Sequence, residues 1–181
     1  MREALDRFLT EFAAQRRGSP HTLAAYRRDV TRVLDLAAGP GRKVDASQWS
    51  RELLERALRE LYRSGHSSAS AARALAAWRS FSRFCLRRGV IASDPARPIR
   101  FPRLSRRLPR TLPSNDLGAA LDRIPGEGAV PVRDRALLEV AYSSGLRVSE
   151  LTGLDLGAID FSTREARITG KGGKTRIVPV G

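Results

Sequence analysis

Cysteine, histidine and long apolar runs are almost missing from this sequence. Among 181 residues there are one cysteine and two histidines, His21 and His66, which stand apart from each other and from any carboxylates at ligand spacing. A single cysteine forms no internal disulfide, and no apolar stretch approaches the ~18 residues that a membrane-spanning helix needs. We therefore expect no bound metal ion, no cofactor and no membrane-spanning helix. With its charged beginning, the chain is interpreted as cytoplasmic.

Acidic residues are scarce in the first part of the chain. Residues 1–110 hold 24 Lys and Arg against 10 Asp and Glu, whereas residues 111–181 hold nine of each, so the net charge of +14 lies in the first part. All but three of the 33 basic residues are arginine, whose planar guanidinium group can donate two parallel hydrogen bonds to phosphate oxygens. Positive charge concentrated in this way predicts a polyanion as the partner.

The apolar pattern of residues 1–94 predicts a unit of four helices. Apolar residues within 5–12 share one helical face, and the pair Ser19-Pro20 is typical of a helix start. A third helix follows, and a fourth is expected over residues 68–88. Cys85 lies among large apolar side chains of that last helix, so it is predicted to be a core residue and not a nucleophile.

Residues 95–113 predict a linker to a second unit formed by residues 114–181. The linker holds five prolines, which favour an extended, helix-free path, and six arginines with no acidic residue. Its charge makes it a candidate DNA-binding segment. The alternative interpretation is a spacer whose charge only keeps it soluble.

Arginines of the fourth helix and of the linker are the predicted phosphate contacts. Between residues 67 and 113 the only acidic residue is Asp94, so these arginines lack the partners that charged helix faces usually carry. For any one of them, a merely solvated surface is the alternative. The predicted DNA-binding residues of this region are Arg73, Arg79, Arg83, Arg87, Arg100, Arg103, Arg106 and Arg107.

The second unit is predicted to combine helices with a small sheet, which makes the fold mainly α overall. A helix begins at residues 114–116, and the apolar segment 135–142 predicts a helix that lies deep in a core and ends at Gly145. A short helix follows over residues 148–153. Three short strands are expected at residues 158–161, 166–169 and 175–180, and Pro179 suits a sheet edge or a strand end.

Arg147 and Lys171 are the candidate catalytic residues. Arg147 stands at a helix start, where free backbone N–H groups favour an anion and a guanidinium can hold two phosphate oxygens. Lys171 stands at the tip of a glycine-rich hairpin, from which it can protonate a leaving alkoxide or touch a base edge. Taken alone, each signal is weak, because such a turn is usually only a hairpin tip.

Several ordered motifs resemble the tyrosine recombinase (phage integrase) family, Xer type. They are Ser19-Pro-His-Thr-Leu-Ala-Ala-Tyr-Arg-Arg-Asp29, Arg73-Ala-Leu-Ala-Ala-Trp-Arg-Ser-Phe81, Tyr142-Ser-Ser-Gly-Leu-Arg-Val-Ser-Glu-Leu151 and Gly170-Lys-Gly-Gly-Lys-Thr-Arg-Ile-Val-Pro179. The resemblance implies a helical, SAM-like core-binding domain and the N-terminal part of an α+β catalytic domain. It also implies a clamp around double-stranded DNA and cleavage by a tyrosine, without a metal or nucleotide cofactor.

The resemblance assigns roles to residues of the second unit. Arg147 matches the first catalytic arginine of the family, and Lys171 matches its hairpin lysine. Glu150 matches an acidic position that orients Arg147, with a plain surface carboxylate as the alternative. Lys174 and Arg176 match basic positions that are not catalytic, and we interpret them as DNA-binding.

The later motifs of the family have no counterpart in these 181 residues. They are a His-x-x-Arg box, a second His or Trp and the nucleophilic tyrosine, and Tyr26, Tyr62 and Tyr142 all lie at predicted core or helix positions. We therefore expect the chain to stop before those motifs and to hold a phosphate without cleaving it alone. Whether it is an enzyme stays open, as does assembly with a second recombinase subunit.

Three functions follow from the sequence. The first is site-specific DNA recombination, including DNA integration and chromosome-dimer resolution, by a Xer-type tyrosine recombinase. The second is a non-catalytic protein that occupies a recombination site on duplex DNA. The third is an arginine-rich helical protein that binds RNA or serves as a scaffold, and a preference for structured RNA over duplex DNA would indicate it.

Overall fold

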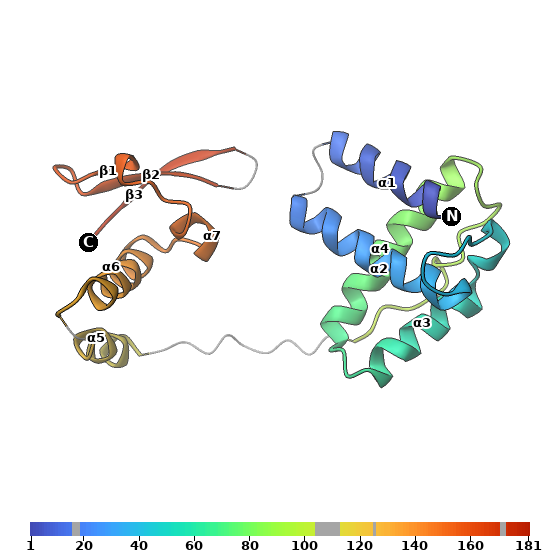
Figure 1. Cartoon of the computed structure of the whole chain (residues 1–181), viewed down its shortest axis with the longest axis horizontal. Coiled ribbons are helices and arrows are strands. Elements are labelled where there is room, and N and C mark those ends of the chain that lie inside the picture. The colour runs from blue at the N-terminus through green and yellow to red at the C-terminus, as the bar shows by residue number, and fades with distance from the viewer. Residues whose placement is uncertain (16–18, 104–112, 125, 171–172) are drawn as a thin grey trace. The chain divides into compact units, whose positions relative to one another are not determined.

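The chain forms two compact units, which are described separately from a computed structural model. The structure describes residues 1–15, 19–103, 113–124, 126–170 and 173–181. The first unit is Met1–Arg107 and the second is Leu108–Gly181 (Figure 1). The mainly helical fold, with one small sheet in the second unit, confirms the predicted fold class.

Four helices build the first unit, at the predicted places. They are α1 (Arg2–Ala14), α2 (Pro20–Ala38), α3 (Arg51–Arg63) and α4 (Ser68–Arg87), with a short 3-10 turn at Ala46–Gln48. Serine side chains cap three of them: Ser19 Oγ accepts from the Thr22 N–H, and Ser50 and Ser67 do the same for α3 and α4. The predicted start at Ser19-Pro20 is confirmed.

Helix α4 forms the centre of the first unit and contacts α1, α2 and α3 (Figure 1). Its Phe81 ring lies 5.1 Å from the Trp49 ring in an edge-to-face arrangement and 5.7 Å from the Phe8 ring. Cys85 is fully buried, and burial raises the pKa of its thiol to about 12. The thiol is therefore protonated and unreactive, as predicted for a core residue.

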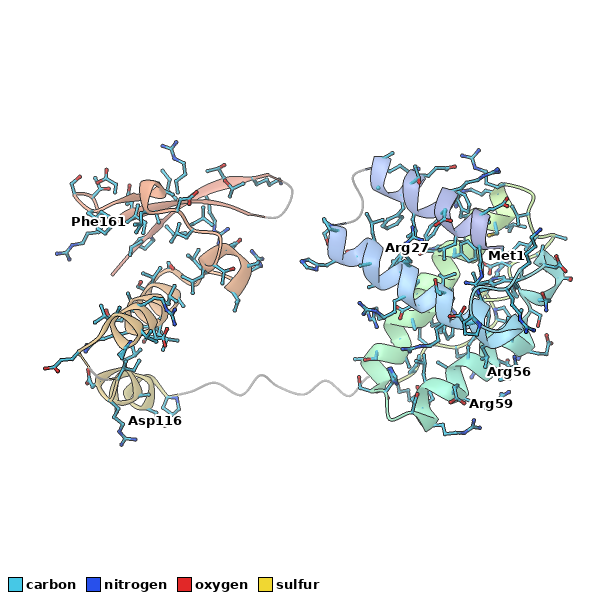
Figure 2. The ribbon with its side chains drawn as sticks, in the orientation of Figure 1. Met1, Arg27, Arg56, Arg59, Asp116 and Phe161 are labelled. Carbon is cyan, nitrogen blue, oxygen red and sulfur yellow. The ribbon has the colours of Figure 1, made fainter. Side chains whose placement is uncertain are left out.

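The surface of the first unit is rich in arginine. Figure 2 shows Arg27, Arg56 and Arg59 extending from α2 and α3, and all three are exposed. Some of these guanidinium groups are already paired, since Arg27 Nη1 lies 2.7 Å from Asp6 Oδ1. Exposed pairs of this kind add little stability, so the positive surface remains available to an anionic partner.

Three helices and a sheet build the second unit. The helices are α5 (Ser114–Asp122), α6 (Ala129–Ser144) and α7 (Val148–Leu151), followed by a 3-10 turn at Leu156–Ala158. The strands β1 (Ile159–Asp160), β2 (Glu165–Thr169) and β3 (Thr175–Pro179) are antiparallel in the order β1-β2-β3. Pro179 ends an edge strand, as predicted, where its missing N–H breaks no ladder.

One face of this sheet carries the small core of the second unit. The side chains of Ala166, Ile168 and Val178 are buried there, because alternate residues of a strand point to one face. Leu146 and Leu154 pack against them from the segment around α7. The core thus ties α7 to the sheet.

The prediction that residues 135–142 lie deep in a core is wrong. None of the residues of α6 is buried, and Leu138 and Tyr142 are 48% and 61% exposed. The described neighbours α5, α7 and β3 contact α6 along part of its length, and much of its apolar surface meets no described side chain. Apolar composition predicts a surface suited to burial, but burial also needs a partner element.

The described helices include none long and apolar enough to cross a membrane. Within the same residues, no three His, Cys, Asp or Glu side chains are gathered closely enough to bind a metal ion.

Candidate phosphate-binding site

Arg147 is placed by a sharp turn between α6 and α7. Gly145 ends α6 in the left-handed conformation, with φ 59° and ψ 30°, and its N–H donates to the Ala141 carbonyl at 3.1 Å. A residue with a side chain rarely adopts this conformation, which explains the glycine. The turn leads Leu146 into the small core and leaves Arg147 at the start of α7.

Glu150, three residues further along in α7, accepts hydrogen bonds from both the backbone and the side chain of Arg147. The Arg147 backbone N–H donates to Glu150 Oε2 at 2.9 Å, and Arg147 Nη1 donates to Glu150 Oε1 at 3.0 Å. The Glu150 side chain is 6% exposed, whereas the Arg147 side chain is 72% exposed. The buried carboxylate of Glu150 thus holds Arg147 in place, while most of the Arg147 side chain faces solvent.

Arg176 brings the β2–β3 hairpin to the same carboxylate. Its Nη1 and Nη2 donate to Glu150 Oε1 and Oε2, each at 2.9 Å, which is a bidentate pair. Arg176 lies on β3 opposite Ile168 of β2. Glu150 therefore joins the hairpin to α7, and we call Arg147, Glu150 and Arg176 the arginine cluster.

Gly170 leaves room for the arginine cluster at the end of β2. A Cβ atom at this position would lie 3.1 Å from Glu150 Oε1 and 3.2 Å from Arg176 Nη1, which is too close for an unshifted contact. The Gly170 N–H donates to the Lys174 carbonyl at 2.8 Å and closes the hairpin. Gly170 thus lets Glu150 and Arg176 pack closely against the end of β2.

The arginine cluster is positively charged overall. The bidentate bond from Arg176, followed by the bond from the Arg147 N–H, lowers the pKa of Glu150 from 4.5 to about 2. At neutral pH one carboxylate therefore faces two guanidinium groups. Because a guanidinium has five N–H donors, Arg147 retains donors for an oxyanion.

Acidification should release the arginine cluster. Because the folded-state pKa of Glu150 is lowered, its contribution to stability is present above about pH 4.5 and is lost as the pH falls towards about 2. We expect Glu150→Gln to lower the thermal unfolding midpoint of the second unit at neutral pH. That difference should shrink as the pH falls from about 4.5 and disappear once the pH has fallen through about 2. Thermal unfolding followed by the amide NMR signals of β2 and β3 checks this, and a pH-independent difference would contradict it.

Two predicted DNA-binding residues have partners inside the first unit. Arg73 Nη1 lies 3.0 Å from Oδ2 of the buried Asp29. The Arg79 guanidinium donates to the carbonyls of Ala96 and Ile99 and lies 4.2 Å over the Phe101 ring. Arg79 therefore fastens the first residues of the proposed linker to α4, and a DNA contact for either arginine stays a prediction.

The remaining predicted residues divide into two groups. Five are exposed, four of them in the first unit and the last in the second: Arg83, Arg87, Arg100, Arg103 and Lys174. Three lie outside the described residues: Arg106, Arg107 and Lys171. The proposed catalytic pairing of Lys171 with Arg147 therefore stays a prediction.

Sequence reasoning missed two contacts, that of Asp29 with Arg73 and that of Gly170 with Glu150. Asp29 stands on the core side of α2, three residues after Tyr26 and next to the buried Val30. A charged residue at a core position of the helical pattern is the signal that could have indicated a buried ion pair. Gly170 was interpreted only as a turn residue. Nothing in the sequence alone places the arginine cluster against it.

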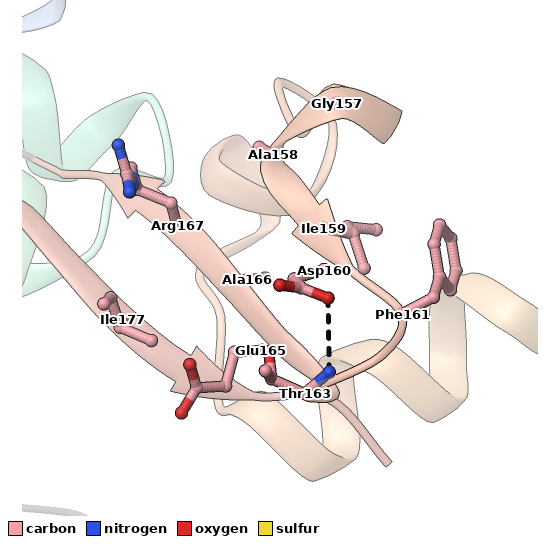
Figure 3. A pocket seen from close by; sticks show the side chains of 10 residues that line it. All are labelled: Gly157, Ala158, Ile159, Asp160, Phe161, Thr163, Glu165, Ala166, Arg167 and Ile177. Carbon is pink, nitrogen blue, oxygen red and sulfur yellow. Dashed lines mark hydrogen bonds between the residues drawn. The ribbon is translucent and has the colours of Figure 1, made fainter.

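A hollow on the sheet of the second unit is a separate feature. Figure 3 shows that Ile159, Phe161, Arg167 and Ile177 line it, and none of the arginine cluster is among its lining residues. Asp160 accepts the N–H groups of Ser162 and Thr163 through Oδ1, which closes the turn after β1. The carboxylate that lines this hollow from β1 thus serves the turn.

Comparisons with known proteins match both units. The sequence model described as "Phage integrase, N-terminal SAM-like domain" matches residues 5–89, and "Phage integrase family" matches residues 110–181. The chain is 43% identical to tyrosine recombinase XerC of Chromobacterium violaceum over 182 residues, and 43% identical to that of Pseudomonas aeruginosa over 185 residues. All of this chain is covered in both cases. It spans 59% of the length of each relative.

Solved structures show the same fold at low sequence identity. The lambda integrase fragment of residues 75–356 bound to DNA superposes with a TM-score of 0.71 at 17% identity, over 98% of this chain and 59% of that one. A lambda integrase tetramer bound to a Holliday junction gives 0.70 at 18%, over 98% and 50%. The chain therefore belongs to the phage integrase family, as a homologue of Xer-type tyrosine recombinases that spans only part of their length.

Proposed function

We propose that this chain binds duplex DNA and supplies part of the active site for site-specific DNA recombination, as in DNA integration or chromosome-dimer resolution. In this proposal residues 1–94 form the DNA-binding domain, residues 95–113 the basic linker, and residues 114–181 part of the catalytic domain. Support comes from the family membership and from the net charge of +14, all of it within residues 1–110.

The arginine cluster is the observation that carries the proposal. Its buried carboxylate fixes Arg147, and 72% of the Arg147 side chain faces solvent. Such a preorganised donor stabilises the charge that develops on a phosphate in a transition state, because it needs no reorganisation during the reaction. Arg147 is therefore assigned to the scissile phosphate, Glu150 to holding Arg147, and Lys171 to protonating the leaving oxygen.

Strand cleavage needs further groups in this proposal. The family resemblance requires a His-x-x-Arg box and a nucleophilic tyrosine, which these 181 residues do not contain. We therefore assign phosphate binding to this chain alone and cleavage to a protein of the relatives' full length. Solved relatives include a DNA-bound dimer and a DNA-bound tetramer of lambda integrase. Assembly of several recombinase subunits on DNA is part of the proposal.

A salt titration tests whether the chain binds duplex DNA. Fluorescence anisotropy is measured with a labelled duplex and with a structured RNA of equal length, between about 50 and 200 mM KCl. We expect the duplex to bind more tightly and its affinity to fall steeply with salt, because several phosphate contacts release counterions. Tighter binding to RNA, or an affinity for duplex that salt does not change, would contradict the proposal.

The second candidate is a non-catalytic protein that occupies a recombination site. The observation that favours it is that the excess charge lies within residues 1–110, a segment that does not include the arginine cluster. In that case a full-length protein would bind recombination-site duplex without cleaving it, whereas the leading proposal requires cleavage that depends on Arg147.

A further inference from the structure

A buried carboxylate stands among arginines in the first unit. Asp29 lies on α2 and is 1% exposed, and Glu150 is the other buried charged residue in the described chain. Val30, the next residue along the chain from Asp29, and Val33, one helical turn further on, are fully buried. A lone carboxylate at such a position costs several kcal/mol unless it has a partner.

The charged groups around Asp29 are all basic. Arg73 of α4 is the nearest, with Nη1 3.0 Å from Asp29 Oδ2. Arg28 and Arg32 of α2, and His66 just before α4, add positive potential. Arg32 Nη1 lies 3.3 Å from His66 Nε2, which links these two groups. Burial nevertheless raises the pKa of Asp29, against the lowering effect of these arginines.

The backbone of Asp29 is fixed where α2 meets α4. Its backbone carbonyl accepts a hydrogen bond from the fully buried Trp78 Nε1 at 2.9 Å, so α2 and α4 are joined at this residue. Among the described residues, neither carboxylate oxygen has a partner with good hydrogen-bond geometry. The carboxylate therefore acts on its neighbours mainly through charge, and most directly on Arg73.

Stability alone gives no reason for this arrangement. A buried carboxylate with one partly exposed partner contributes little to stability, and well-packed apolar replacements of buried pairs are often neutral or stabilising. The Arg73 side chain is 44% exposed, so its donors that do not face Asp29 remain open to solvent. The arrangement instead reduces the freedom of Arg73 and offsets repulsion between Arg28, Arg32 and Arg73.

We propose that Asp29 is a positioning residue for DNA binding, whose buried charge holds Arg73 and gathers Arg28 and Arg32 beside it to bind the phosphate backbone of the duplex. The inference rests on the proposed duplex binding and adds residues to it. Phosphate is the expected ligand, because the exposed groups around Asp29 are guanidinium groups, which donate paired hydrogen bonds to phosphate oxygens.

Neutralising the carboxylate tests the inference. Asp29→Asn keeps the shape and removes the charge, and we expect it to weaken duplex binding about fivefold, because Arg73 is no longer held. Simple loss of a negative charge would strengthen binding instead. The matched control is Asp35→Asn, on the same helix and also paired with an arginine, Arg2, at 2.6 Å. That control should leave affinity unchanged or raised.

Two further comparisons separate positioning from folding. In the Arg73→Ala background, Asp29→Asn should weaken binding by less than the roughly fivefold loss expected in the wild type, because Arg73 is the side chain that Asp29 holds most directly. The urea midpoint of Asp29→Asn should be unchanged or higher. If Asp29→Asn does not fold, Arg73→Ala is compared with Arg83→Ala, an exposed arginine of the same helix. Arg73→Ala should lower duplex affinity at least about threefold more than Arg83→Ala does. The reason is that the Arg73 side chain, already held by Asp29, loses less conformational entropy when it binds a phosphate.

The outcomes distinguish this inference from the proposed function. Salt-dependent duplex binding by the wild type together with unchanged or tighter binding by Asp29→Asn would overturn the inference alone. Independent, multiplying effects of Asp29→Asn and Arg73→Ala would do the same. Absence of duplex binding by the wild type would overturn both.

Discussion

Replacing Arg147 with alanine is expected to lower the rate of DNA strand cleavage at least about 100-fold, since it removes a preorganised donor to the developing phosphate charge. The test uses a chimera in which this chain continues into the remaining sequence of the Chromobacterium violaceum XerC, to which it is 43% identical. Cleavage is measured on a nicked duplex that traps the covalent product. Duplex affinity should fall less than about tenfold, because one charge is lost among many phosphate contacts.

Arg167→Ala is the control for Arg147→Ala. Arg167 is exposed on β2 of the same unit and lies outside the arginine cluster, so the substitution removes the same charge without touching Glu150. Cleavage by the control should stay near the wild-type rate. Equal losses in the two variants would mean that overall charge, and not the position of Arg147, sets the rate.

Replacing Trp78 with alanine is expected to lower the free energy of unfolding of the first unit by about 3–5 kcal/mol, as for other large core truncations. Trp78 is fully buried on α4, and its Nε1 donates to the Asp29 carbonyl. The substitution leaves a cavity at the crossing of α2 and α4 and a buried carbonyl without its partner. Urea unfolding measures the loss.

Tryptophan fluorescence isolates the first unit in this experiment. The sequence has two tryptophans, and the other one, Trp49, is buried in the same core. Trp78→Phe is the control: it keeps most of the volume and loses the hydrogen bond, so its cost should be clearly smaller. A change below about 1 kcal/mol in Trp78→Ala would show that this core is not what stabilises the unit.

Local signals in the sequence predicted local structure well. The Ser19-Pro20 helix start, the end of α6 at Gly145 and the placing of Pro179 at a strand end are all confirmed, because each depends on the conformation of a few neighbouring residues. The depth of α6 was predicted wrongly, since Leu138 and Tyr142 show only that a surface is apolar. They do not show which element covers it.

Contacts between distant residues were beyond such reasoning. The bond from Arg176 to Glu150 joins residues 26 apart, and that from Trp78 to Asp29 joins residues 49 apart. Periodicity predicts which face a residue occupies but not what it meets there. For this reason the sequence did not predict that the Arg79 guanidinium binds the backbone of the segment that follows α4, while a DNA contact of Arg79 stays a prediction.

The most direct test of the central claim is whether Arg147 meets DNA. The Nε–H signal of Arg147 and the amide signals of residues 145–151 are followed by NMR in this 181-residue chain as duplex DNA is added. We expect these signals to shift together with those of the first unit, and the Arg147 side-chain shift to disappear in Glu150→Gln, which no longer holds the guanidinium. Shifts confined to the first unit would contradict the assignment of Arg147 to a DNA phosphate.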